Sequence, residues 1–127
     1  MNHILLIAAG GAVGATGRHL VGLASLRFFG PGWPWGTLLA NILGGLAMGL
    51  LVGWLASEQR AHATELRYAL GVGLLGGFTT FSAFSLEVVM MIERKAVLTA
   101  AGYVGLSVVA AVGAVMLGLL LSRSAFG

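Results

Sequence analysis

The segment from residue 76 to residue 85 is the part of this sequence whose residue types are best suited to hold an ion. It reads Gly-Gly-Phe-Thr-Thr-Phe-Ser-Ala-Phe-Ser and lies within an apolar stretch. Neighbouring glycines, threonines and serines weaken a helix and offer its backbone other hydrogen bonds. Carbonyl oxygens freed by a helix break are suitable ligands for a small hard cation, because protein, water or an ion must satisfy them. The alternative is an intact, kinked helix whose hydroxyls bond to their own turn.

Phe81 and Phe84 are three residues apart, so they share one face if this part of the chain is helical. The edge of an aromatic ring is positive. Two ring edges turned toward a pathway could stabilise an anion without a full charge that would trap it. Packing against lipid or against other helices is the commoner role for such a pair.

Asn41 is an amide within another apolar stretch, where it is costly unless paired. Its NH₂ group could donate to an anion, and Thr37, one helical turn earlier, adds a hydroxyl to the same face. The alternative is that Asn41 only joins two helices. In the last apolar stretch, Tyr103 and Ser107 likewise place two hydroxyls one turn apart.

Arg18 and Glu87 are ionisable residues at or inside apolar stretches. Arg18 could extend to the water interface or line a positive vestibule for anions. Glu87 could pair with a basic residue or take part in proton coupling.

The composition indicates whether these residues belong to a soluble protein or to a membrane protein. Of 127 residues, 9% are charged (seven Lys or Arg and four acidic), 58% are hydrophobic, and the mean hydropathy is +0.98. A soluble domain has about 25% charged residues, so this chain has too little polar surface to face water. A soluble enzyme, a disordered chain and a disulfide scaffold are excluded, and the absence of cysteine excludes thiolate metal sites. The basic residues are scattered, so we expect no nucleic-acid partner.

Long uncharged runs at 28–57, 68–86 and 96–122 predict membrane-spanning helices, each of which needs about 20 residues. We predict a single domain over residues 1–127, an all-α membrane protein with four spans and a break in the third. The spans are expected at about 4–26, 36–56, 68–91 and 98–121, with Arg18 inside the first. A β-barrel would show alternating segments of about ten residues instead.

Glycines at four-residue spacing within the spans let helix backbones approach closely. They are Gly10 and Gly14; Gly45, Gly49 and Gly53; and Gly73 and Gly77. This pattern indicates close helix packing. No nucleophile or metalloprotease motif accompanies it, so no enzyme is expected.

The basic residues of the short loops predict no single orientation in the membrane. Four spans place Arg60, Arg67 and Arg123 on one side, and Arg27, Arg94 and Lys95 on the other. Because Lys and Arg favour the cytoplasmic side, a tie of three to three favours insertion both ways and an antiparallel dimer. The alternative is that one charge near a membrane end, or a lipid factor, decides the orientation.

Three blocks of residues resemble the small four-helix fluoride channels known as Fluc or CrcB proteins. They are Gly10-Gly11-x-x-Gly14-Ala15-x-x-Arg18, Gly36-Thr37-Leu38-x-x-Asn41-x-x-Gly44, and the segment from Gly76 to Glu87. The blocks are collinear, each falls in the expected span, and the resemblance covers the whole chain.

The resemblance implies an antiparallel homodimer in the cytoplasmic membrane with two fluoride pathways. It also implies a sodium ion at the dimer centre, held by the carbonyls of Gly76 and Thr79. Asn41, Phe81 and Phe84 match pore-lining residues of the family. Further matches to its polar track and vestibule are Thr37, Ser82, Tyr103, Ser107 and Arg18. Fluoride would leave the cell passively, driven by the inside-negative potential.

Two positions depart from the family pattern. His19 stands where the family often has Tyr, and Ala83 stands where Thr is common, so one hydroxyl of the polar track is absent. The main alternative function is a small proton-coupled multidrug exporter with dual topology. Such an exporter needs an acid in mid-membrane, usually in the first helix, where this chain has Arg18 instead. A membrane assembly factor without transport activity is the other alternative.

Overall fold

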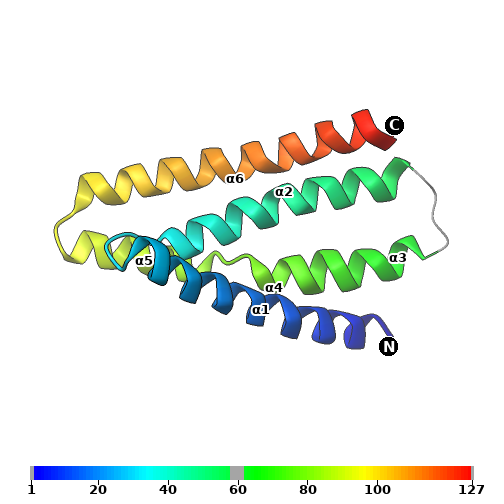
Figure 1. Cartoon of the computed structure of the whole chain (residues 1–127), viewed down its shortest axis with the longest axis horizontal. Coiled ribbons are helices and arrows are strands. Elements are labelled where there is room, and N and C mark those ends of the chain that lie inside the picture. The colour runs from blue at the N-terminus through cyan, green and yellow to red at the C-terminus, as the bar shows by residue number, and fades with distance from the viewer. Residues whose placement is uncertain (1, 58–61, 127) are drawn as a thin grey trace.

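Every regular element that the structure describes is helical. The structure is a computed structural model, and it describes residues 2–57 and 62–126. The elements, in chain order, are α1 (Asn2–Phe29), α2 (Trp35–Ser57), α3 (Ala63–Leu66), the π-helix η1 (Arg67–Leu75), α4 (Gly76–Phe78), α5 (Ser82–Glu93) and α6 (Val97–Phe126). The elements from α3 to α5 together form the third long stretch (Figure 1).

Among the described residues, four helical stretches are long and apolar enough to cross a membrane. They run over His3–Phe29, Trp35–Ala56, Ala63–Glu93 and Val97–Ala125. Each contains one of the predicted spans and extends beyond it at one or both ends. The prediction of an all-α membrane protein with four spans and an interrupted third is confirmed, and the dimer stays a prediction.

The start of α1 and the end of α6 lie at one end of the bundle, together with the end of α2 and the start of α3 (Figure 1). Arg67 and Arg123 lie toward this end. Arg27 is in the last turn of α1, and Arg94 and Lys95 are in the loop between α5 and α6, at the other end. Arg60 lies outside the described residues.

The glycines spaced by four residues on α2 lie against α6. A Cβ atom added to Gly45 would come within 2.9 Å of the Ala111 carbonyl oxygen, and one on Gly49 or Gly53 would collide with Val115 or Ser122. Only glycine lets the two helices come this close. The Ser122 hydroxyl adds a hydrogen bond of 2.7 Å to the Leu50 carbonyl of α2.

A second glycine contact brings α1 against the third span. Cβ atoms on Gly10 and Gly14 would collide with the carbonyls of Ala69 and Leu74, and one on Gly77 would lie 2.8 Å from the Gly11 carbonyl. The backbones of α1 and of the third span therefore touch directly just before the helix is interrupted.

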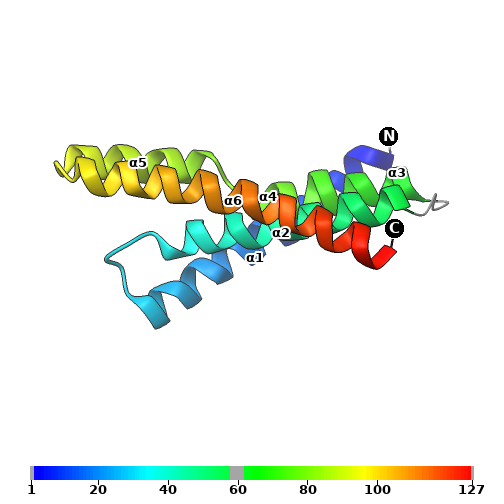
Figure 2. The same cartoon turned by 90° about the horizontal axis from the view of Figure 1, so that it is seen from above.

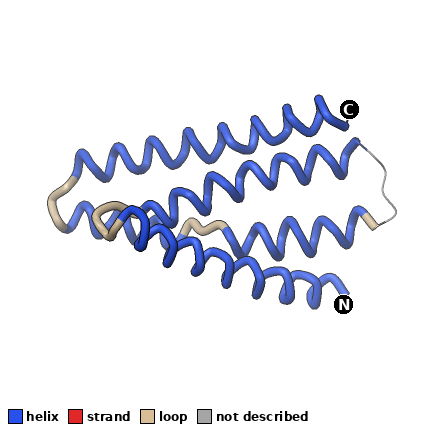
Figure 3. The backbone as a smooth tube through the Cα atoms, in the orientation of Figure 1, coloured by secondary structure: helices blue, strands red, loops and turns tan. Residues whose placement is uncertain are grey.

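The third span is irregular along half of its length. It begins with the short α3, continues as the π-helix η1, and ends its first part at Phe78. Thr79 is extended, with φ −89° and ψ 159°, and the helix resumes at Ser82. Figure 3 shows the interruption as a loop between two helical pieces. π-Helical turns are rare in proteins, and those that do occur are often found at functional sites.

Candidate ion pathway

The side-chain amide of Asn41 holds the interrupted backbone of the third span. Its Oδ1 accepts a hydrogen bond of 2.8 Å from the Thr80 N–H, and its Nδ2 donates one of 3.0 Å to the Thr80 carbonyl. The amide thus takes the place of the helical neighbours that Thr80 lacks. An amide nitrogen has two N–H groups, so one further donor remains on Asn41.

The hydroxyls of the interrupted segment serve its own backbone first. Thr79 Oγ1 donates to the Leu75 carbonyl at 2.9 Å, and Thr80 Oγ1 accepts from the Ala83 N–H at 3.1 Å, near the start of α5. Ser82 is exposed, and its Oγ lies 3.3 Å from Thr80 Oγ1. Of the hydroxyls in this stretch, that of Ser82 is the one bonded to another hydroxyl and not to the backbone.

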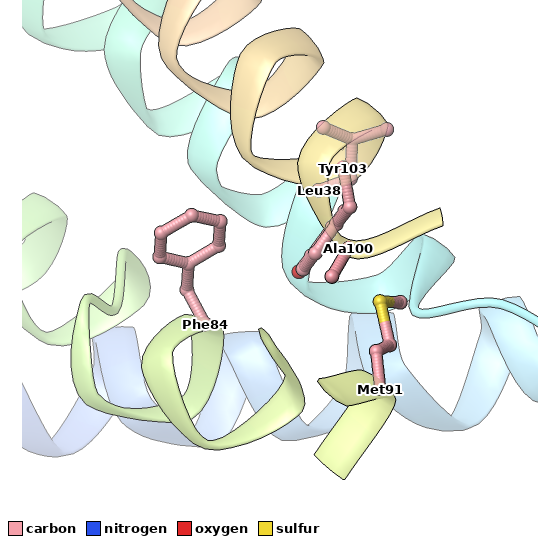
Figure 4. Packing of buried hydrophobic residues seen from close by; sticks show 5 residues of the cluster. All are labelled: Leu38, Phe84, Met91, Ala100 and Tyr103. Carbon is pink, nitrogen blue, oxygen red and sulfur yellow. The ribbon is translucent and has the colours of Figure 1, made fainter. Parts of the chain in front are cut away.

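Phe81 and Phe84 are neighbours with different surroundings. Their ring centroids are 5.7 Å apart with an interplanar angle of 48°. Phe81 is 78% exposed on the face of the single chain, whereas Phe84 is 9% exposed and packs against Tyr103. Figure 4 shows Phe84 at the edge of a cluster with Leu38, Met91, Ala100 and Tyr103, between α2, α5 and α6.

A cavity of about 520 Å³ collects the polar candidates that surround the interruption. Asn41, Phe81, Phe84 and Ser107 line it, and none of its lining residues is charged. The Ser107 hydroxyl is buried and has no hydrogen-bond partner among the described residues. This uncharged cavity offers an amide, two aromatic rings and an unpaired hydroxyl to a guest.

Thr37 and Tyr103 lie elsewhere, in a network centred on Glu87. The Thr37 hydroxyl donates to Glu87 Oε2 at 2.9 Å, and the Tyr103 hydroxyl donates to Oε1 at 2.8 Å. Thr37 and Glu87 line a second cavity of about 430 Å³, to which Arg18 and Arg94 also contribute. The sequence indicates Thr37, Tyr103 and Glu87 as separate candidates and does not predict the hydrogen bonds that join them. The signal available was that Glu87 follows Phe84 by three residues and so shares its helix face.

Arg18 lies beside the interruption. Its Nε donates to the Gly77 carbonyl over 3.4 Å, a long hydrogen bond, from α1 to α4. The close approach of α1 at its glycines brings the guanidinium to this point. A cation near the carbonyl end of a helix is favoured by the helix dipole.

Replacing Asn41 by Leu should destabilise the protein, because the Thr80 N–H and carbonyl both lose their partner. Each polar group left unpaired in a buried place costs about 1–3 kcal/mol. We expect a clear fall in the thermal unfolding temperature in detergent, followed by circular dichroism.

Ser85→Ala is the matched control. The Ser85 hydroxyl donates to the Phe81 carbonyl at 2.8 Å, but that carbonyl also accepts the Ser85 N–H. Removing the hydroxyl leaves no group unpaired, so the unfolding temperature should barely change. Equal losses for the two variants would contradict the role of Asn41.

Comparisons with known proteins agree on one family. A family described as "CrcB-like protein, Camphor Resistance (CrcB)" matches residues 5–119. Proteins named "Fluoride-specific ion channel FluC" are similar over nearly the whole chain. Those of Phenylobacterium zucineum and Caulobacter sp. (strain K31) are 56% and 52% identical over 126 residues, which cover 99% of this chain and 99% and 98% of theirs. The one from Agrobacterium fabrum is 48% identical over 99% of this chain and 100% of its own. The chain belongs to the CrcB-like family.

Proposed function

We propose that this chain forms a fluoride-selective ion channel that exports fluoride passively across the bacterial cytoplasmic membrane. Relatives that are 52% and 56% identical to this chain over nearly their full length are named fluoride-specific ion channels. Their names, which are those of ion channels, also confirm that no enzyme is to be expected. The observation that carries the proposal is the uncharged cavity lined by Asn41, Phe81, Phe84 and Ser107.

The chemistry of this cavity suits a small, strongly hydrated anion. A pore must replace the water of fluoride with close donors, yet hold the ion weakly enough to release it. The second N–H of Asn41 and the Ser107 hydroxyl are dipoles, and a ring edge is the positive part of a quadrupole, so all of them attract an anion without trapping it. Chloride is larger and gains less from a narrow path lined with such donors.

A proton-coupled multidrug exporter fits the structure less well. The carboxylate of Glu87 lies in the third span, and both of its oxygens accept hydrogen bonds from neighbouring hydroxyls. The first span has no acidic residue. No feature of the described residues favours this alternative over the channel.

A second, antiparallel copy of the chain is proposed to cover the face that bears the interruption. Gly76, Phe81 and Ser82 are exposed on this face of the single chain. Irregular backbone at membrane depth survives only where protein or water covers it. The equal numbers of basic residues predicted at the two ends support an antiparallel arrangement.

Sodium is the cation proposed for the centre of that dimer. Gly76 and Thr79 both line the uncharged cavity, and backbone carbonyl oxygens suit a hard cation. Two carbonyls from each of two copies would surround the ion. Once bound, it would neutralise the carbonyl dipoles where the two interrupted helices meet.

Liposomes test the proposed channel directly. Vesicles loaded with fluoride and chloride, and containing the protein, should release fluoride rapidly and retain chloride, as read by ion-selective electrodes. Phe81→Ile and Phe84→Ile remove the ring edges. We expect each to slow fluoride release about tenfold, which corresponds to about 1.4 kcal/mol in the barrier.

Leu98→Ile is the control for that measurement, because Leu98 is 88% exposed on α6 and lines neither cavity. It should conduct as the parent does. If the parent protein releases neither fluoride nor chloride, the proposed function is wrong. Normal release by both Phe variants would overturn only the part assigned to the rings.

Replacing sodium by N-methylglucamine during purification tests the cation. We expect the dimer fraction, measured by size-exclusion chromatography with light scattering, to fall when sodium is withdrawn and to recover when it is returned. Potassium, a larger ion, should restore it less. Equal dimer fractions in the three cations would contradict a sodium site.

A further inference from the structure

The loop between α1 and α2 places one aromatic side chain against the Glu87 network. Trp33 and Tyr103 have ring centroids 5.1 Å apart at an interplanar angle of 78°. This edge-to-face arrangement is a favoured geometry for aromatic pairs. Trp33 is half-buried and packs against the hydrophobic cluster that includes Tyr103. The contact joins a loop to a helix that follows it by some seventy residues.

The backbone of the loop is restricted on both sides of Trp33. Gly30 has a positive φ of 76°, which turns the chain after α1. Pro31 and Pro34 flank the tryptophan, and each fixes its own φ angle. The Trp35 N–H donates to the Trp33 carbonyl at 2.8 Å, and the ring centroids of the two indoles are 4.9 Å apart.

Tyr103 contacts two aromatic rings where it reaches Glu87. Its side chain is fully buried, and its hydroxyl donates to Glu87 Oε1. Besides Trp33, its ring contacts Phe84, at 5.2 Å between centroids. Phe84 comes from the same helix as Glu87, whereas Trp33 comes from the loop between α1 and α2. At this end of the bundle α1 and α2 diverge from α5 and α6 (Figure 2).

The hydrogen bond of Tyr103 affects the charge beside the 430 Å³ cavity. With donors on both oxygens, the Glu87 carboxylate is held in place and part of its charge is balanced. Without the phenol, one oxygen would be left to face the cavity or to pair with Arg18 or Arg94, which line it too. A freed carboxylate would repel an anion in this cavity.

We propose that Trp33 is a positioning residue that holds the phenol of Tyr103 on Glu87. The assignment rests on the proposed function where it concerns fluoride flow, and on geometry alone where it concerns Tyr103. The indole lines the 430 Å³ cavity and also packs against the ring of Tyr103, so it fixes from the loop a side chain that belongs to α6.

A simpler role for Trp33 would be to anchor the chain at the membrane surface, where tryptophan is common. Phe29 provides the comparison. It is the last residue of α1, at the same end of the bundle as Trp33, and it is 56% exposed. Its ring centroid lies 5.2 Å from that of Trp35. Phe29→Leu therefore removes an aromatic side chain from the interface without touching Tyr103, and it is the matched control.

Fluorine NMR reports the position of Tyr103 independently of ion flow. The chain has two tyrosines, Tyr68 and Tyr103, so the Tyr68→Phe protein labelled with 3-fluorotyrosine gives one protein resonance. Trp33→Leu should shift and broaden it, Trp33→Phe should restore most of the original signal, and Phe29→Leu should leave it unchanged. An unchanged resonance in Trp33→Leu would overturn the proposal.

Fluoride release from liposomes then tests whether Trp33 acts through the phenol. Loss of one aromatic pair should slow release about 2- to 10-fold in Trp33→Leu, and Trp33→Phe should recover most of the rate. In a Tyr103→Phe background, Trp33→Leu should add nothing, because interacting residues are not additive. Independent, additive effects of the two substitutions would contradict the assignment.

The two readouts separate the possible failures. A parent protein that releases no fluoride would overturn the proposed function, while the resonance of Tyr103 would still decide the role of Trp33. Should Trp33→Leu not yield folded protein, Trp33→Met keeps more volume without a ring and is subject to the same two tests.

Discussion

The requirement that every backbone polar group inside a membrane have a partner governs this structure. The third span stops being helical at Thr79 and resumes at Ser82, so Thr80 lacks helical neighbours at a depth where no lipid can replace them. Asn41 supplies both missing bonds from α2. The arrangement then depends on α2 lying close, which the glycine contacts with α6 and the clustered side chains between α2, α5 and α6 make possible.

The same requirement decides which groups remain for an ion. Thr79 and Thr80 use their hydroxyls on the backbone of the interrupted segment. Among the residues that line the uncharged cavity, what is left is the second N–H of Asn41, the unpaired hydroxyl of Ser107 and the rings of Phe81 and Phe84. These are weak, separate, neutral donors, which is the combination that lets an ion bind and leave. Charged groups gather in the other cavity, where Glu87 is already held by two hydroxyls.

The sequence predicts the parts of this arrangement that depend on local composition. Gaps between charges locate the four spans, and the Gly-Gly and Thr-Thr pairs locate the interruption. The helices exceed the predicted spans because residues such as Arg67 and Arg123 continue the helix at the membrane ends. The sequence does not predict the π-helix, since its residues resemble those of any apolar helix.

Sequence patterns do not predict contacts between segments that are far apart in the chain. The partner of Asn41 is 39 residues away, and Glu87 is bound by residues 50 and 16 positions distant. Helical spacing predicts a shared face for Phe81 and Phe84, but only the packing of α6 decides that one is buried and the other exposed. Trp33 lies in a loop, where periodicity has no meaning. The roles that the family resemblance gives to the individual site residues stay predictions.

The central claim is that neutral dipoles on this fold select fluoride, and a reversal potential tests it most directly. In a planar bilayer containing the protein, sodium and chloride are kept equal on both sides, and a tenfold fluoride gradient is balanced with gluconate. A conductance carried by fluoride alone should reverse at about 59 mV in magnitude, the value for a tenfold ratio of a singly charged ion. A reversal potential near zero would show that chloride or sodium carries the current, and would contradict the account.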